Sequence, residues 1–140
     1  MSYILDTNVI SELVVAQPNP NVADWVENLD PERAFISVIT IGELKKGIEK
    51  LPDSARKSAL DHWLHAELLV RFQGHLLPLD VDTMLTWGAL YARLEAVGKP
   101  MPAIDSLLAA SAAHTGFTLV TRNVDHFEHT GIALLNPWTK

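Results

Sequence analysis

The segment Tyr3-Ile4-Leu5-Asp6-Thr7-Asn8 sets the pattern from which the fold of this chain is predicted. Its three apolar residues are typical of a short buried strand, and the run stops at an acidic residue. Thr7 or Asn8 is suited to cap a helix that continues to about Ala16. A strand that leads directly into a helix is the repeating unit of an α/β fold.

The same alternation continues to the end of the chain. Further strands are predicted at residues 34–37, 76–79, 118–120 and 132–135, and further helices at 21–29, 39–50, 53–73, 82–97 and 103–115. Parallel neighbours need a crossover of a dozen or more residues, which these helices supply. We therefore predict one α/β domain over residues 1–140, with a central, mostly parallel five-stranded sheet flanked by helices.

Composition excludes several classes of protein. The chain has 140 residues, 48% of them hydrophobic, and no cysteine. Disulfides, Cys-ligated zinc, iron–sulfur clusters and a thiol nucleophile are thereby excluded, and a reducing compartment is expected. The first residues lack the basic and apolar regions of a signal peptide, and no apolar run has the ~20 residues of a membrane span. We expect a soluble, cytoplasmic protein with no membrane partner.

The charge balance is acidic overall but locally basic. Eleven Lys and Arg residues against 17 Asp and Glu give a net charge of −6, which at first sight disfavours a nucleic-acid partner. Five of the basic residues lie within 13 positions: Lys45, Lys46, Lys50, Arg56 and Lys57. Such a stretch is usually a solvated helix face, and a local phosphate contact is the alternative.

Four acids lie where the predicted strands end or the following helices begin. Asp6 follows the first strand, Asp125 follows the fourth, and Glu43 and Asp105 lie early in helices. In an open parallel sheet the functional crevice lies beyond the carboxyl ends of the strands, where the strand order reverses. Taken singly, each acid is explained as a cap, turn or surface residue. Together they are expected to converge.

The surroundings of two of these acids favour a metal site. Glu43 and Asp105 lie within apolar stretches, where an unpaired buried carboxylate is costly. Clustered carboxylates repel one another, and a hard divalent cation such as Mg²⁺ or Mn²⁺ would compensate them. Two histidines, His62 and His65, lie one helical turn apart, but no third ligand is evident, so packing or surface roles are predicted for them.

Other functions that use an acid after a strand fit less well. A receiver-type phosphoacceptor needs an acidic pair after the first strand and a lysine after the last strand. The chain has Asp6 alone, and Asn136-Pro137 follows the last strand. An aspartyl phosphatase needs a second acid at the position of Asn8. Glycine-rich nucleotide-binding loops and a Gly-x-Ser-x-Gly elbow are absent from the sequence.

Four motifs resemble the PIN-domain ribonucleases, specifically the VapC/FitB-type toxins of bacterial toxin–antitoxin pairs. They are Ile4-Leu5-Asp6-Thr7-Asn8, the Glu43 segment, Met101 to Ala110, and Leu119-Val120-Thr121-Arg122-Asn123. The resemblance extends through Trp138. It implies that Asp6, Glu43 and Asp105 occupy the acidic metal-site positions. At the fourth position Asn123 follows Thr-Arg and His126 precedes Phe127, so Asp125 is displaced by one residue. Asp125, Asn123 or a water then completes the site.

The resemblance implies a Mg²⁺- or Mn²⁺-dependent endoribonuclease that acts as a toxin. Asp6 and Asp105 would hold the metal directly, Glu43 directly or through water, and Asp125 would orient water or a second ion. The implied partners are an RNA substrate, a cognate antitoxin and a second copy of the chain in a homodimer. The alternative is a PIN-like interaction module with an inactive site.

Overall fold

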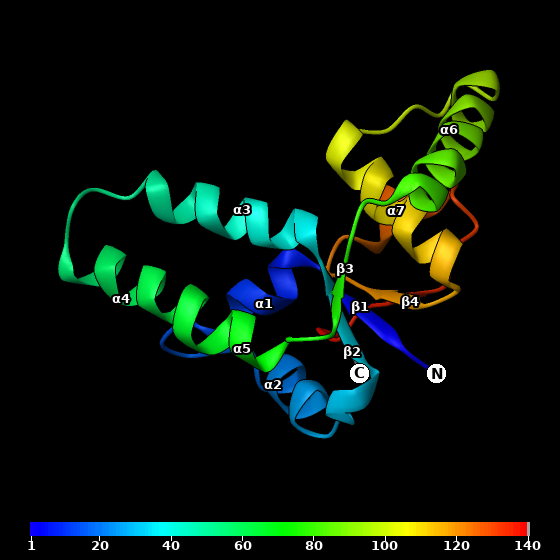
Figure 1. The fold of residues 1–140 in the computed structure, drawn as a ribbon. Coiled ribbons are helices and arrows are strands. Elements are labelled where there is room, and N and C mark those ends of the chain that lie inside the picture. Colours follow the sequence, from blue (N-terminus) through cyan, green and yellow to red (C-terminus); the bar gives the residue numbers. More distant parts are fainter. Residues whose placement is uncertain (140) are drawn as a thin grey trace.

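The fold is built on a parallel sheet. The computed structural model describes residues 1–139, and its strands all run in the same direction (Figure 1). The sheet order is β3-β2-β1-β4-β5. The strands are β1 (Tyr3–Leu5), β2 (Ala34–Ser37), β3 (Leu76–Leu77), β4 (Thr118–Val120) and β5 (Leu134–Leu135). The predicted α/β class with a five-stranded parallel sheet is confirmed.

Helices connect the strands. They are α1 (Thr7–Leu13), α2 (Pro20–Glu27), α3 (Val38–Glu49), α4 (Ala55–Trp63), a π-helical turn η2 (Leu64–Leu68), α5 (Leu69–Arg71), α6 (Val81–Ala96) and α7 (Ala103–Thr115), with short 3₁₀ turns η1 (Pro31–Arg33) and η3 (Val124–Phe127). Helices α1 to α5 lie on one side of the sheet, and α6 and α7 lie on the other (Figure 1). Within residues 1–139, none of the helices is long and apolar enough to cross a membrane.

Side-chain alternation along the strands divides the core in two. Leu5 packs into a cluster with residues of α1 to α4 and η2, whereas its neighbour Ile4 packs into a second cluster with residues of α6 and α7. Val120 and Leu119 of β4 divide in the same way. Because these residues of β1 and β4 face both layers, Ile4, Leu5, Leu119 and Val120 are all buried.

The start and end of α1 differ from the prediction. Asp6, rather than Thr7 or Asn8, is the N-cap, since its Oδ1 accepts a hydrogen bond from the Thr7 amide at 2.7 Å. The helix ends at Leu13 instead of near Ala16, and the β-branched Val14 and Val15 that follow are exposed. Strand β5 is also shorter than predicted, because only Leu134 and Leu135 pair with β4.

The turn after α7 needs a glycine. Gly116 has φ +74°, and its amide donates to the Ala112 carbonyl, which closes the helix. Gly116→Ala is expected to lower the free energy of unfolding by about 1 kcal/mol, because an alanine is strained in this region. Urea unfolding measures the loss. Gly47→Ala, in a helical conformation with open space around the Cβ position, is the control and should not destabilise the protein.

Candidate functional site

The candidate site lies where the strand order reverses. β1 is paired with β2 on one side and with β4 on the other, and Asp6 and Thr121 directly follow β1 and β4. The Asp6 amide donates to the Val120 carbonyl at 2.9 Å, which extends the β1–β4 pairing to the edge of the sheet. This is the place at which open parallel sheets bind ligands.

Asp6 is the one buried acid of the four predicted site residues, with 8% of its surface exposed. Its Oδ2 accepts a hydrogen bond from the Thr121 hydroxyl at 2.8 Å and a longer one from the Asn8 amide group at 3.4 Å. Asn8 also donates to the Thr121 hydroxyl oxygen at 3.2 Å. Both carboxylate oxygens are therefore oriented by neutral donors.

Burial raises the pKa of Asp6 above its ordinary value. Hydrogen bonds from Thr121 and Thr7 act in the opposite direction, while the negative charges of Glu43 and Asp105 raise the pKa further. The charges of Glu43 and Asp105 thus act on Asp6 in the folded chain. The repulsion that the sequence led us to expect is present at this edge of the sheet.

Glu43 is held beside Asp6 through the first residue of α1. The Thr7 hydroxyl donates to Glu43 Oε1 and lies 3.2 Å from the hydroxyl of the buried Thr40. Thr40 was not among the predicted site residues, although it lies one helical turn before Glu43 on the same side of α3. The expectation that Glu43 is buried was wrong, because the residue is exposed.

Asp105 and Asp125 lie on the α7 side of the site. Asp105 is in the first turn of α7 and is partly exposed, and its Oδ2 lies 3.9 Å from Nδ1 of His126. Asp125 is exposed on η3, and its carboxylate makes no hydrogen bond or ion pair within residues 1–139. The Asn123 backbone amide donates to the Thr121 hydroxyl oxygen at 3.2 Å. The loop after β4 therefore contacts the same hydroxyl that donates to Asp6.

The donor set has the chemistry of a site for a hard cation. Asp6, Glu43 and Asp105 offer carboxylate oxygens, and in the described part of the chain no Lys or Arg forms an ion pair with any of the three. Such oxygens suit Mg²⁺ or Mn²⁺. The described side chains contain no group of three or more His, Cys, Asp or Glu already arranged around a common point. Glu43 and Asp105 would therefore have to turn inward to share an ion with Asp6.

Acids and histidines elsewhere have structural explanations. Asp80, which follows β3, caps α6 by accepting from the Thr83 amide and hydroxyl at 2.9 and 2.7 Å. These bonds lower the pKa of Asp80. His62 and His65 are exposed, and Nδ1 of His65 lies 2.9 Å from the Asp61 carbonyl oxygen.

Thr121→Val tests how far the hydroxyl orients Asp6. The substitution keeps the shape of a buried side chain but leaves Asp6 Oδ2 without its shortest hydrogen bond, so a loss of about 1–3 kcal/mol in the free energy of unfolding is expected. A second consequence is a further rise in the pKa of Asp6, because a bond that favours the charged form is removed. The first is measured by urea unfolding and the second by NMR titration of the Asp6 carboxyl carbon. Thr121→Ser, which keeps the hydroxyl, should retain the wild-type pKa.

Fold and site together define an α/β protein with a buried, oriented carboxylate at the point where the strand order of a parallel sheet reverses. Residues 3–133 match the PIN domain family, and the chain belongs to this family.

Individual relatives cover nearly the whole chain. VapC ribonuclease Y4jK from Sinorhizobium fredii is 36% identical, with 96% of each chain covered. Toxin FitB from Neisseria gonorrhoeae is 34% identical over 96% of this chain and 97% of its own length. The crystal structure of FitAcB from Neisseria gonorrhoeae matches with a TM-score of 0.94 and 33% identity, over 99% of both chains.

Proposed function

We propose that this protein is a metal-dependent endoribonuclease that acts in the cytoplasm as the toxin of a toxin–antitoxin pair. The observation that carries the proposal is the buried Asp6 carboxylate, oriented by Thr121 and Thr7 and exposed to the negative charges of Glu43 and Asp105. Relatives named as a ribonuclease and as a toxin, at 36% and 34% identity over nearly the whole chain, support the activity and the role.

Each acidic side chain would have its own role at the metal ion. Asp6 and Asp105 would hold Mg²⁺ or Mn²⁺ directly, and Glu43 would bind it directly or through water. Asp125, or Asn123 beside it, would orient water at the open side. A divalent cation in such a site polarises a phosphate and lowers the pKa of a bound water. Thr121, Thr7 and Asn8 would keep Asp6 ionised and in position.

The alternative function is a PIN-like interaction module without activity. The purified chain should be incubated with a panel of structured RNAs in EDTA, Mg²⁺ or Mn²⁺, and its melting temperature should be recorded under the same conditions. If the protein is a nuclease, it should cleave RNA only when Mg²⁺ or Mn²⁺ is present, and its melting temperature should be higher with the cation than in EDTA. If a folded sample shows neither cleavage nor a rise in melting temperature, the inactive module is favoured.

We further propose that the antitoxin inserts an Arg or Lys among Asp6, Glu43, Asp105 and Asp125. A guanidinium can satisfy two carboxylate oxygens without a metal. Apolar residues of the antitoxin would occupy the α1/α3/α4 groove, a groove of 780 Å³ that begins at Thr7 and Glu43 and is bordered by Val14, Leu44 and Trp63 among others.

Replacing the inserted cation of the cognate antitoxin by Ala is expected to weaken inhibition of cleavage while the complex still forms. Inhibition is measured over a range of Mg²⁺ concentrations, and complex formation by calorimetry. Replacement of an exposed antitoxin cation outside the groove is the control. Undiminished inhibition at high Mg²⁺ would contradict direct occlusion of the acids.

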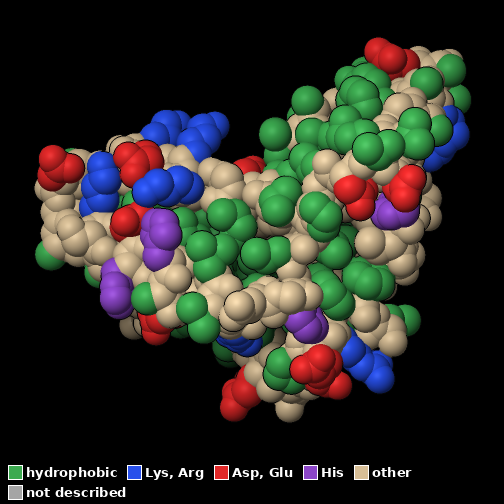
Figure 2. All heavy atoms as spheres, in the orientation of Figure 1, with side chains coloured by type: hydrophobic (Ala, Val, Ile, Leu, Met, Phe, Trp, Pro, Cys, Tyr) green, Lys and Arg blue, Asp and Glu red, His purple; other side chains and the backbone are tan. Residues whose placement is uncertain are grey.

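A homodimer is proposed through the face of α6 and the start of α7. Val81, Leu85 and Ile104 are 75%, 68% and 47% exposed there. Figure 2 shows hydrophobic side chains gathered over these helices. Exposed apolar patches of this kind mark protein interfaces. Sedimentation analysis of Leu85→Glu against the wild type tests the assignment, with a monomeric variant as the expected result.

A further inference from the structure

One face of α3 leads away from the candidate site and carries exposed basic residues. Glu43, Gly47 and Lys50 recur at intervals of four and three residues, so they lie on one side of the helix, and Lys46 flanks them. From Glu43 to Lys50 this face extends about 10 Å. Gly47 and, across from it, Arg56 of α4 line the α1/α3/α4 groove together with Glu43.

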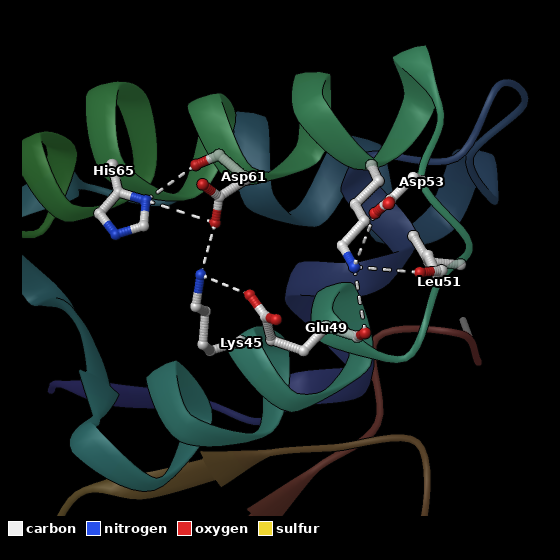
Figure 3. Close-up of polar contacts among 7 residues, drawn as sticks. Lys45, Glu49, Leu51, Asp53, Asp61 and His65 are labelled. Atoms are coloured by element: carbon white, nitrogen blue, oxygen red, sulfur yellow. Dashed lines mark hydrogen bonds and ion pairs between the residues drawn. The ribbon is translucent and has the colours of Figure 1, made fainter.

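Two neighbouring lysines are already engaged (Figure 3). Lys45 contacts Asp61 Oδ1 at 2.8 Å and Glu49 Oε1 at 2.9 Å, which links α3 to α4 and raises the pKa of Lys45. Lys57 donates to the backbone carbonyls of Glu49 and Leu51 at 3.2 and 3.1 Å. These two residues hold the helix pair together.

Lys46, Lys50 and Arg56 make no such contacts. Each is exposed, and within residues 1–139 none of the three has an acidic or carbonyl partner. Figure 2 shows Lys and Arg side chains gathered over the α3 and α4 arm. On a chain with a net charge of −6, this is a local surface on which a polyanion can be accommodated.

Gly47 adds an independent observation. It lies inside α3, where a glycine costs about 0.5–1 kcal/mol relative to alanine. Its φ is not positive, and a Cβ built on it would meet nothing within 4 Å. Neither backbone conformation nor packing inside this chain therefore requires a glycine. A glycine on the floor of a groove does permit the backbone of a ligand to approach closely.

We propose that Lys46, Gly47, Lys50 and Arg56, called here the basic groove face, bind the phosphodiester backbone of single-stranded RNA beside the site of cleavage. The three cations contact phosphates, and Gly47 leaves room for the strand above α3. This inference rests on the proposed ribonuclease function and assigns the surface that holds its substrate. Arg56 lines the groove, and Lys46 and Lys50 lie on the exposed surface beside it. Lys and Arg gathered beside a groove are the usual electrostatic footprint of such binding.

The first test measures binding to a short fluorescein-labelled single-stranded RNA of mixed sequence, in EDTA and with antitoxin absent. Lys46→Ala/Lys50→Ala is expected to weaken binding at least about tenfold and to reduce the slope of log K against log salt by about 1.4. In cleavage assays with Mg²⁺ the same variant should raise KM and leave kcat nearly unchanged. Arg33→Ala/Lys99→Ala removes equal charge elsewhere and should bind like the wild type.

The second test uses the glycine, since its expected effects on stability and binding have opposite signs. Gly47→Ala should raise the melting temperature by a few degrees and yet weaken RNA binding at least about threefold. Gly42→Ala is the matched control. Gly42 is also a helical glycine with nothing within 4 Å of its Cβ position, but it does not line the groove. It should gain similar stability without loss of binding.

The outcomes separate the two proposals. If the wild type neither binds nor cleaves RNA, the proposed function fails. If it does both, and the lysine and Gly47 variants behave like their controls, the basic groove face is wrong while the function stands. Variants that bind RNA normally but lose affinity for the antitoxin would assign this face to the antitoxin and would overturn the inference.

Discussion

Asp6→Asn is expected to lower the rate of RNA cleavage by about 10²–10³-fold, the size of the loss caused by removing one oriented group that stabilises developing charge in an active site. The amide keeps the size of the side chain and an oxygen for the Thr7 amide, but it removes the anionic ligand that a divalent cation requires. Cleavage of a labelled RNA in Mg²⁺ measures the effect. Asp24→Asn, at an exposed position on α2, is the control and should cleave at the wild-type rate.

The same variant should be no less stable than the wild type. Because burial raises the pKa of Asp6, the folded protein holds this proton more tightly than the unfolded chain does. The stability associated with the proton is present below the ordinary pKa of 3.8 and is lost as pH rises through the raised value. In EDTA, the melting temperature of Asp6→Asn should therefore rise relative to that of the wild type as pH increases from 3.8 through the raised pKa of Asp6. Undiminished cleavage by a folded Asp6→Asn sample would refute the assignment of Asp6.

Phe127→Ala is expected to reduce the free energy of unfolding by about 3–5 kcal/mol. Phe127 is 1% exposed and packs among the residues of α6 and α7, so its removal leaves a cavity in the second core cluster. Its carbonyl also accepts from the Thr130 hydroxyl at 2.6 Å, which fixes the end of η3. A domain is stable by about 5–15 kcal/mol, so this single change removes a large share.

Thermal and urea unfolding measure the effect of Phe127→Ala. Phe127→Leu, which keeps most of the volume, should lose about 1 kcal/mol. Val97→Ala, at a position 61% exposed, should stay within about 0.5 kcal/mol of the wild type. Since η3 carries Asp125 and His126, cleavage by Phe127→Ala should also fall at temperatures where the protein remains folded. An unfolding free energy equal to that of Val97→Ala would contradict the buried role of Phe127.

The parts of the fold that sequence predicted best are bounded by strong local signals. Residues 34–37, 103–115 and 118–120 form the predicted elements with the predicted bounds, because Pro, Gly and helix caps mark their ends. The last strand was predicted too long. Apolar residues such as Ile132 satisfy the pattern of a strand whether or not a neighbouring strand is there to pair with them, and β4 offers only Leu119 and Val120.

The candidate site was predictable only in part. The position of Asp6 after a central strand follows from the order of elements, and its burial agrees with that position. Burial of Glu43 was inferred from apolar neighbours, but helical periodicity turns Ile39 and Leu44 inward and leaves Glu43 exposed. The Thr7 bridge to Glu43 joins residues 36 positions apart, and local pattern carries no information about such a contact.

The hydrogen bond between Thr7 and the Asp6 carboxylate allows cation binding to be followed by NMR. One oxygen of this carboxylate accepts from the Thr7 amide, so the proton of that amide senses the charge on the group. A cation that shares the carboxylate would draw electron density from this acceptor and weaken the hydrogen bond. The amide resonance of Thr7 should then move upfield, and its proton should exchange faster with solvent, as Mg²⁺ is titrated. Occupancy can thus be followed at one backbone position without RNA and without turnover.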